Sequence, residues 1–393
     1  MQSCQLNREG VTKLQDDKGL SVIGFSCHPC SLSRTPVALD NNELMIVLDG
    51  SHGEGGGQIL RTAFVLSLLS DQPFRIENIR LGRPNPGLKP QHVHIGKALL
   101  EMSDCQIEGL KLGSMAITFY PGRILGGIHG IDIGTAGAIP LFMQTILPVA
   151  TFGETSTSFV VTGGTDVRGA MMIDFLNEVI LPFVRPYAQK LELQVNTHGF
   201  YPVGGGKVKL RAVPKMTQQS WINERGKLPA LNLPARGELK RVRMLSLASR
   251  DLSERRVAER QISAFKQQSK FEHLEAKVVT IDSASPGSSV TAIAEYERTR
   301  IGSDSLGEKT KSAEEVGTEA AARLRTEMDA DGTVDVHTAD NLMIWAALFG
   351  GDYRFREVTG HIATNAWTIE HFLPGALRLE GNRVIGLPDA LSS

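Results

Sequence analysis

A glycine-rich turn between a strand pattern and a helix pattern constrains this chain more than any other feature. The apolar residues 45–48 are typical of a buried strand, and Gly53-Glu54-Gly55-Gly56-Gly57 follows shortly after. Apolar residues then recur at helical spacing over 58–69. A turn of this kind leaves backbone N–H groups free at a helix N-terminus, where the helix dipole favours phosphate. Glycines also occur where only the backbone conformation of a turn requires them. The pattern therefore fits either a phosphate-binding site or a purely structural turn.

Strand and helix patterns alternate through the rest of the chain. We expect strands at 73–80 and 207–213 and helices at 90–102, 136–150 and 172–190. A Tyr-Pro pair recurs at Tyr120-Pro121 and Tyr201-Pro202, each upstream of a glycine pair or triplet. This weak repeat predicts that βα units of about 80 residues build a large domain by duplication. The fold class is therefore α/β or α+β.

The domain organisation follows from the length and from a change in composition. A chain of 393 residues exceeds the roughly 250–300 residues that one hydrophobic core usually holds. Charge density rises between about 215 and 298, where strand-like runs surround an amphipathic helix pattern at 254–268. We expect a large domain at 44–213 and 299–393, with a small α/β domain inserted at 214–298. Residues 1–43 are polar and aperiodic, which predicts a partly disordered extension.

Composition limits the function classes. Lys and Arg number 42 against 43 Asp and Glu, a net charge of −1, so any contact with a polyanion must be a local patch. No apolar run approaches the roughly 18 residues of a membrane span. Four cysteines in so long a chain favour a reducing, cytoplasmic setting. The Cys27-His28-Pro29-Cys30 motif has no second pair to complete a zinc site.

Three further features could carry chemistry. Arg61, Arg80, Arg83 and Lys89 gather around a proline- and glycine-rich stretch, which suits bidentate phosphate contacts, although a solvated basic loop has the same pattern. Glu54 would repel phosphate unless it meets a divalent cation. His361 stands just before the last helix pattern, at 363–372. A helix N-terminus keeps a nearby histidine neutral and able to act as a nucleophile, but a lone histidine is most often structural.

Together these segments resemble the RNA 3′-terminal phosphate cyclase family. The most specific block is Asp49-Gly-Ser-His-Gly-Glu-Gly-Gly-Gly-Gln-Ile-Leu-Arg-Thr62. The likeness continues, in the family's order, through Ile79–His92, Ile133–Ala138, Gly163–Asp166, His198–Gly206, Ala339–Leu342 and His361-x-x-Thr-Asn365. The resemblance implies a large domain of repeated βαβαββ units, as in the C-terminal domain of a bacterial initiation factor and in enolpyruvate transferases, with a small inserted α/β domain.

The resemblance also implies a reaction. A histidine takes AMP from ATP and releases pyrophosphate, AMP passes to the 3′-phosphate of an RNA, and the 2′-hydroxyl then closes a 2′,3′-cyclic phosphate. By position, His361 matches the adenylated histidine, and Glu54 matches the residue that meets Mg²⁺ or Mn²⁺. Gln91, Asp340, Asn341 and Arg61 match nucleotide-binding positions, and Arg61, Arg80 and Arg83 match positions that bind phosphates of the RNA end. A homodimer is compatible with the family.

The chain departs from the family pattern in two places. After Gly163-Gly-Thr-Asp166 the family commonly has a proline-rich stretch, where this chain has Val167-Arg-Gly-Ala-Met-Met172. His337 stands where some members carry an aromatic residue that could stack on adenine. Two alternatives to a catalytic cyclase remain: a cyclase-like ribosome-assembly factor that lacks the nucleophile, and a small-molecule transferase of the enolpyruvate type. His361 and the intact block from Glu54 to Arg61 argue against the first alternative.

Overall fold

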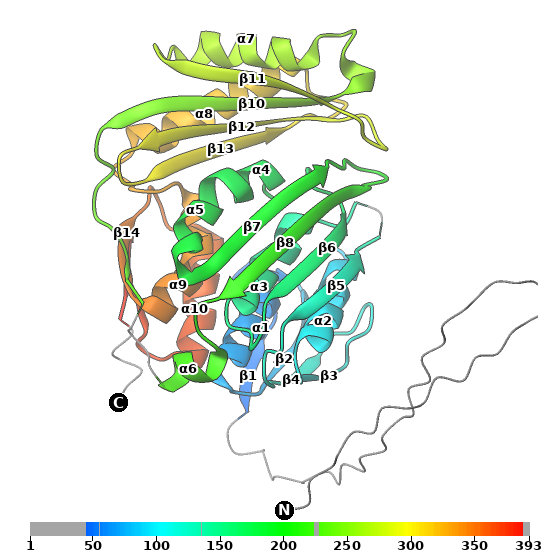
Figure 1. Ribbon diagram of the computed structural model, residues 1–393, viewed down its shortest axis with the longest axis vertical. Coiled ribbons are helices and arrows are strands. Elements are labelled where there is room, and N and C mark those ends of the chain that lie inside the picture. The colour runs from blue at the N-terminus through cyan, green and yellow to red at the C-terminus, as the bar shows by residue number, and fades with distance from the viewer. Residues whose placement is uncertain (1–44, 55, 135, 224–227, 388–393) are drawn as a thin grey trace, which may run out of the picture. The chain divides into compact units, whose positions relative to one another are not determined.

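The computed structural model describes residues 45–54, 56–134, 136–223 and 228–387 (Figure 1). The expected N-terminal extension and its Cys-x-x-Cys motif lie outside these residues. Within them, no helix combines the length and the apolar character needed to cross a bilayer.

The first repeat spans 46–120 and has the order βαβαββ. It consists of β1 (Ile46–Asp49), α1 (Gln58–Ser70), β2 (Phe74–Glu77), α2 (Pro90–Met102), β3 (Gln106–Glu108) and β4 (Ile117–Tyr120). Its sheet has the order β1-β2-β4-β3, in which β1 and β2 are parallel and the other neighbours antiparallel. A parallel pair needs a crossover connection, and α1 provides it.

The second repeat, at 127–214, has the same order of pairing. It contains β5 (Gly127–Asp132), α3 (Ile139–Ala150), β6 (Thr157–Gly163), α4 (Ile173–Phe175), α5 (Leu181–Val184), β7 (Ala188–Thr197) and β8 (Gly206–Pro214). The sheet order is β5-β6-β8-β7, again with a parallel first pair. The predicted helix at 172–190 is therefore too long. Pro186 cannot donate a backbone hydrogen bond, and the chain enters β7 two residues later.

The third repeat is interrupted in sequence and complete in space. After α6 (Gln218–Asn223), the strand β9 (Leu231–Leu233) pairs in parallel with β14 (Gly351–Arg354), more than a hundred residues later. The unit is completed by α9 (Val336–Phe349), α10 (Gly360–Phe372), β15 (Leu377–Glu380) and β16 (Arg383–Gly386), and its sheet order is β15-β16-β14-β9. The described residues thus contain three βαβαββ units, and the predicted α+β class is confirmed.

The insertion between β9 and α9 folds around its own core. It comprises β10 (Leu239–Ser249), α7 (Val257–Ser269), β11 (Leu274–Ile281), β12 (Ser288–Tyr296), β13 (Arg300–Leu306) and α8 (Ala313–Asp329), with the sheet order β11-β10-β12-β13. Its buried apolar cluster includes Met244, Phe265 and Leu324. Arg236 joins the entry of this segment to its exit, because its Nη1 donates to the Met328 carbonyl at 2.6 Å.

This second core extends beyond the expected boundary at residue 298, because β13 and α8 complete its sheet and its helical layer. Polar residues of β13 are buried against the repeats: the Met172 amide donates to Asp304 Oδ2 at 2.8 Å, and the Gly302 amide to Asp335 Oδ2 at 2.9 Å. We propose that the inserted domain runs from about 236 to 330, which includes both Arg236 and the end of α8.

The repeats share one large core. α1 packs against α3 and α10, and α9 packs against α10, so helices of all three units meet at the centre (Figure 1). Phe64 of α1 contacts the rings of Phe74 and Phe119, and Phe74 also meets Phe372 of α10. Because residues far apart in sequence build this core, the polar ends of these helices are brought together at one place.

A buried charged cluster joins the second repeat to the inserted domain. His198 Nδ1 lies 3.0 Å from Asp166 Oδ2, and Ser289 of β12 donates to the other oxygen of Asp166 at 2.9 Å. Asp174 lies on the far side of the imidazole, 3.9 Å from its Nε2. Burial raises the pKa of Asp174 to about 6, with His198 opposing and Asp166 adding to the shift.

We expect Asp174→Asn to change how stability depends on pH. Asp174 has a pKa of about 6 in the folded chain and about 3.9 when unfolded, so the folded state binds more protons between these values and loses stability as pH rises through them. From pH 5 to pH 8 the wild type should lose about 1.4 kcal/mol of unfolding free energy relative to the variant. Chemical denaturation at both pH values measures this difference, and parallel pH profiles would contradict it.

Candidate active site

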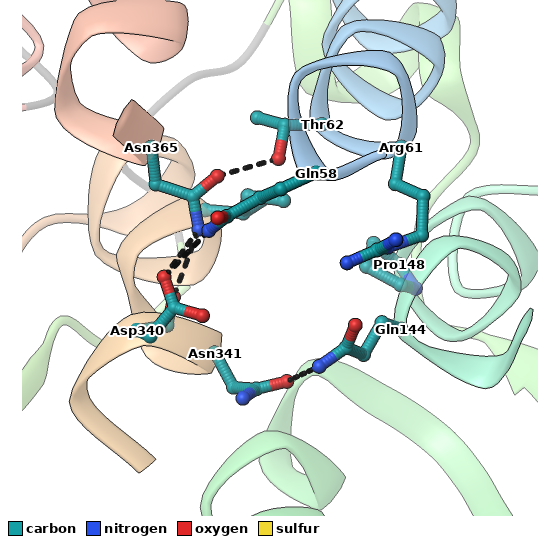
Figure 2. Close-up of a pocket in the computed structure, with 9 residues that line it drawn as sticks. Gln58, Arg61, Thr62, Gln144, Pro148, Asp340, Asn341 and Asn365 are labelled. Carbon is teal, nitrogen blue, oxygen red and sulfur yellow. Dashed lines mark hydrogen bonds between the residues drawn. The ribbon is translucent and has the colours of Figure 1, made fainter. Parts of the chain in front are cut away.

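Residues from four helices line a pocket (Figure 2). α1 contributes Gln58, Arg61 and Thr62, α3 contributes Gln144 and Pro148, α9 contributes Asp340, Asn341 and Ile344, and α10 contributes Asn365. All three repeats therefore supply a wall. Arg61 points into the pocket from the side opposite Asp340 and Asn365 (Figure 2).

Gln58 connects this pocket to His361. Its Nε2 donates to Asp340 Oδ1 at 2.8 Å and to the His361 carbonyl at 3.1 Å. Both partners are acceptors, so the atom of the Gln58 amide that faces them must be the nitrogen. The amide oxygen then faces His361 Nδ1 and accepts its hydrogen. Nδ1 therefore carries the proton of the neutral imidazole, and Nε2 keeps a free lone pair.

The sequence placed His361 just before the last helix, but the structure places it in the first turn of α10. The side chain of Thr359 caps this helix by accepting from the Ile362 amide at 3.2 Å. Capping starts the helix one residue earlier than the histidine. The imidazole is 51% exposed, so a reactant can reach it.

Glu54 faces the free nitrogen of this histidine. Its Oε2 lies 3.4 Å from His361 Nε2 and 3.6 Å from Arg83 Nη2. The approach requires glycine at Gly360, because a Cβ there would lie 2.4 Å from Glu54 Oε1. The structure thus brings together three of the residues predicted from sequence: Glu54, Arg83 and His361.

The arginines form a positively charged wall beside α1. Burial lowers the pKa of Arg61 to about 10, although Asp340 opposes the shift. Burial lowers the pKa of Arg80, and the positive charge of Arg83 lowers it further. The Nε atoms of Arg80 and Arg83 are buried without a hydrogen-bond partner among the described residues. A buried donor without a partner is unfavourable by about 1–3 kcal/mol, which a bound anion would relieve.

His92 lies beneath the glycine turn as a neutral donor. Its Nδ1 accepts from the Lys89 amide at 3.0 Å, so Nε2 carries the proton. Nε2 has no partner among the described residues and lies where a side chain on Gly57 would stand. Burial, Arg61, Arg80 and Lys89 together lower the pKa of His92 to about 3. As predicted, His92 and His94 lie on a helix, α2.

The predicted nucleotide-binding residues divide into two groups. Asp340 and Asn341 line the pocket, where Asp340 also accepts from Asn365 Nδ2 at 2.7 Å and Asn341 Oδ1 accepts from Gln144 Nε2 at 2.9 Å. Burial raises the pKa of Asp340, and His361 is the largest opposing influence. Gln91 lies in the first turn of α2 and is not among the residues that line this pocket.

The polar residues that organise the site were not among those predicted from the sequence. Gln58, Thr62, Gln144 and Asn365 form its hydrogen-bond network, in which Thr62 Oγ1 donates to Asn365 Oδ1 at 2.6 Å. The signal was present, since Gln58 closes the glycine-rich block and Asn365 ends the His361-x-x-Thr-Asn motif. Their partners lie 303 residues away, so their roles need the fold.

Fold and site together define an α+β protein in which a polar pocket lies beside an exposed histidine and a group of arginines. A family model for RNA 3′-terminal phosphate cyclase matches residues 52–379. The chain therefore belongs to the RNA 3′-terminal phosphate cyclase family, and the resemblance seen in its sequence is confirmed.

Curated relatives agree with this assignment. The RNA 3′-terminal phosphate cyclase of Pyrococcus furiosus is 38% identical over 347 residues, which cover 86% of this chain and 96% of the relative. That of Archaeoglobus fulgidus is 39% identical over 350 residues, covering 87% and 99%. Among solved structures, the chain is similar to the enolpyruvyl transferase NikO from Streptomyces tendae. The match covers 85% of this chain and 80% of the NikO chain at 8% sequence identity. Its TM-score of 0.21 is too low to equate the two folds.

Proposed function

We propose that this enzyme converts the 3′-terminal phosphate of an RNA into a 2′,3′-cyclic phosphate with ATP, through AMP bound covalently to His361. Membership of the family supports the overall reaction. The observation that carries the covalent step is the Gln58 hydrogen bond, which holds the proton on Nδ1 and leaves the lone pair on Nε2, the nitrogen that faces Glu54.

The proposed reaction has three displacements. His361 Nε2 attacks the α-phosphorus of ATP, the bond to the bridging oxygen breaks, and pyrophosphate leaves. An oxygen of the RNA 3′-phosphate then attacks the same phosphorus and expels the histidine, which gives RNA(3′)pp(5′)A. Finally the vicinal 2′-hydroxyl loses its proton and attacks the RNA phosphorus, and AMP leaves. The histidine thus divides one difficult step into easier ones.

The surrounding residues have proposed roles that match their positions. Arg61, Asp340 and Asn341 line the pocket and would hold the nucleotide, with Gln91 a more peripheral contact. Arg80 and Arg83 would bind the phosphate of the RNA end, because the Nε atom of each has no hydrogen-bond partner among the residues that the structure describes. Opposing charges held in place before the reaction stabilise the negative charge that develops on phosphorus oxygens.

Glu54 fits a divalent cation of the magnesium type. The described residues contain no group of three acidic, histidine or cysteine side chains that could hold a metal ion by themselves. Mg²⁺ is usually bound through one or two carboxylates together with substrate phosphates, so one carboxylate beside His361 is sufficient. When bound, Mg²⁺ or Mn²⁺ would offset charge on the triphosphate.

The alternative of a cyclase-like assembly factor without catalysis is disfavoured by the site itself. His361 is present, exposed and oriented by Gln58. A protein that only binds would have no need of an imidazole with a free Nε2. A cytoplasmic location and a homodimer stay predictions from sequence.

The proposed reaction is tested with an RNA that carries a labelled 3′-phosphate. Incubation with the protein, ATP and Mg²⁺ should make the label resistant to phosphatase, because a cyclic diester has no terminal monoester. Omitting ATP should leave the label sensitive. A label that stays sensitive with well-folded protein, in Mn²⁺ as well, would favour the non-catalytic alternative.

Arg83→Ala is expected to weaken use of the RNA end more than it weakens the fold. Arg83 is 40% exposed and pairs with Glu54 only at 3.6 Å, so its loss should change unfolding by less than about 1 kcal/mol. We expect KM for 3′-phosphate RNA to rise about 10-fold, the effect of roughly 1.4 kcal/mol. Arg75→Ala is the matched control, since Arg75 is 43% exposed and pairs with Glu77. Equal losses of melting temperature and activity would contradict phosphate binding.

A further inference from the structure

The turn that carries Glu54 runs along α10 in regular steps. Glu54 lies against His361 at 3.4 Å. Gly53 lies against Thr364, because a Cβ on Gly53 would stand 2.5 Å from Thr364 Oγ1. One residue earlier, the His52 ring stacks on Trp367, with ring centroids 4.0 Å apart and planes inclined by 14°. Since each helical residue rises 1.5 Å, the stack lies about 9 Å along α10 from His361.

A third ring lies beside Trp367 along the helix. His371 lies one turn after Trp367, with centroids 4.4 Å apart and planes inclined by 55°, and its Nδ1 bonds to the Trp367 carbonyl at 2.8 Å. We call His52, Trp367 and His371 the ring strip. His52 and His371 are exposed and Trp367 is partly exposed, whereas Trp221 and Trp345 are 1% and 3% exposed.

Open rings of this kind suit the flat face of a nucleobase. Proteins bind single-stranded nucleic acid by stacking successive bases on aromatic side chains, and this contact tolerates any sequence because every base has a π-face. Trp367 and His371 of α10, together with His52 of the neighbouring turn, provide such a surface. A core-packing role alone would not require two of the three rings to be exposed.

The position of the ring strip favours RNA over the base of ATP. The pocket between α1, α3, α9 and α10 is lined by residues of all three repeats, and the proposed function assigns it to ATP. An RNA end continues into a chain that must leave the protein, so it needs an open surface beside the reacting phosphate. The ring strip is open and starts two residues from Glu54.

We propose that the ring strip stacks the base of the nucleotide that bears the RNA 3′-phosphate and so positions that phosphate beside His361. This inference rests on the proposed function. It assigns the ring strip no part in the transfer of AMP from ATP to His361, and it predicts that the enzyme depends on the presence of a terminal base but not on its identity.

The test uses the fluorescence of the tryptophans. The chain has three, and only Trp367 is accessible enough to meet a base. A 3′-phosphate oligoribonucleotide with adenine at its last position should quench this fluorescence. The same oligonucleotide with an abasic last position should quench little and bind about 10-fold more weakly. Trp367→Leu should remove this 10-fold preference, Trp367→Phe should keep part of it, and His52→Ala should reduce it.

Labelling of the protein by ATP in the absence of RNA separates this inference from the proposed function. Both Trp367 variants should become labelled at the wild-type rate. Equal binding of the adenine and abasic oligonucleotides to the wild type would contradict base stacking on the ring strip and leave the proposed reaction intact. A Trp367→Leu variant that loses labelling and RNA binding to the same extent would show a structural role and overturn it as well. A wild type that binds no 3′-phosphate RNA would overturn both.

Discussion

His361→Ala is expected to abolish formation of the cyclic phosphate while leaving the fold unchanged. The imidazole is half exposed, and its hydrogen bond to Gln58 is its strongest contact, so truncation removes little packing. Without the nucleophile the three displacements cannot begin. We expect a loss on the order of 10⁴-fold or more, the scale seen when a covalent nucleophile is removed. The phosphatase-resistance assay measures it.

The control for this variant is His273→Ala, which removes an exposed histidine of the inserted domain. Its activity should equal that of the wild type, and both variants should melt near the wild-type temperature. A His361→Ala enzyme that retains a tenth of the activity would show that another group accepts AMP or that no covalent step occurs.

Gln58→Leu is expected to have the second largest effect. The variant keeps the volume of the side chain but loses the acceptor for His361 Nδ1–H and the donor to Asp340. The imidazole is then free to rotate and to place its proton on Nε2, which cannot attack phosphorus. We expect the rate of AMP transfer to the protein to fall about 100-fold at saturating ATP, within the range for loss of an orienting partner.

Gln144→Leu is the matched control for Gln58. Gln144 lines the same pocket but bonds to Asn341 and makes no contact with His361. Its loss should raise the ATP concentration needed for half-maximal labelling and leave the maximal rate within a few-fold of the wild type. Similar effects on the maximal rate in both variants would contradict an orienting role that is specific to Gln58.

Local patterns predicted the first helices well, but the Tyr-Pro pairs do not mark equivalent positions in the repeats, because Tyr120 ends β4 whereas Tyr201 lies between β7 and β8. Glycines end the apolar run before α1, and helical spacing of apolar residues marks α1 and α2 almost to the residue. The third repeat could not be assembled in this way. Its first strand, β9, has three residues, and its partner β14 follows the whole inserted domain. Only the pairing in space shows that they form one unit.

The end that we propose for the inserted domain differs from the sequence prediction for a related reason. β13 reads Arg-Ile-Gly-Ser-Asp-Ser-Leu, which lacks the apolar run of a buried strand. Ser303, Asp304 and Ser305 are nevertheless buried, because backbone and side-chain groups of α8 and of the repeats satisfy them. Hydrophobicity alone cannot identify a strand whose burial depends on distant hydrogen-bond partners.

In the site, sequence indicated the reactive residues and missed those that orient them. Glu54, Arg61, Arg83 and His361 have side chains whose chemistry is conspicuous in a phosphate site. Gln58 and Asn365 are uncharged amides, and amides occur throughout any chain. Their meaning depends on Asp340, to which both donate at under 3 Å. That convergence is a property of three helices from two repeats.

The most direct test of a covalent His361–AMP uses ATP labelled at the α-phosphate. The protein is incubated with it and Mg²⁺, denatured and digested, and the labelled peptide is identified by mass spectrometry. We predict one acid-labile AMP adduct on the imidazole of His361, absent from His361→Ala and formed slowly by Gln58→Leu. An adduct on another residue, or none on a well-folded wild type in either Mg²⁺ or Mn²⁺, would contradict the mechanism.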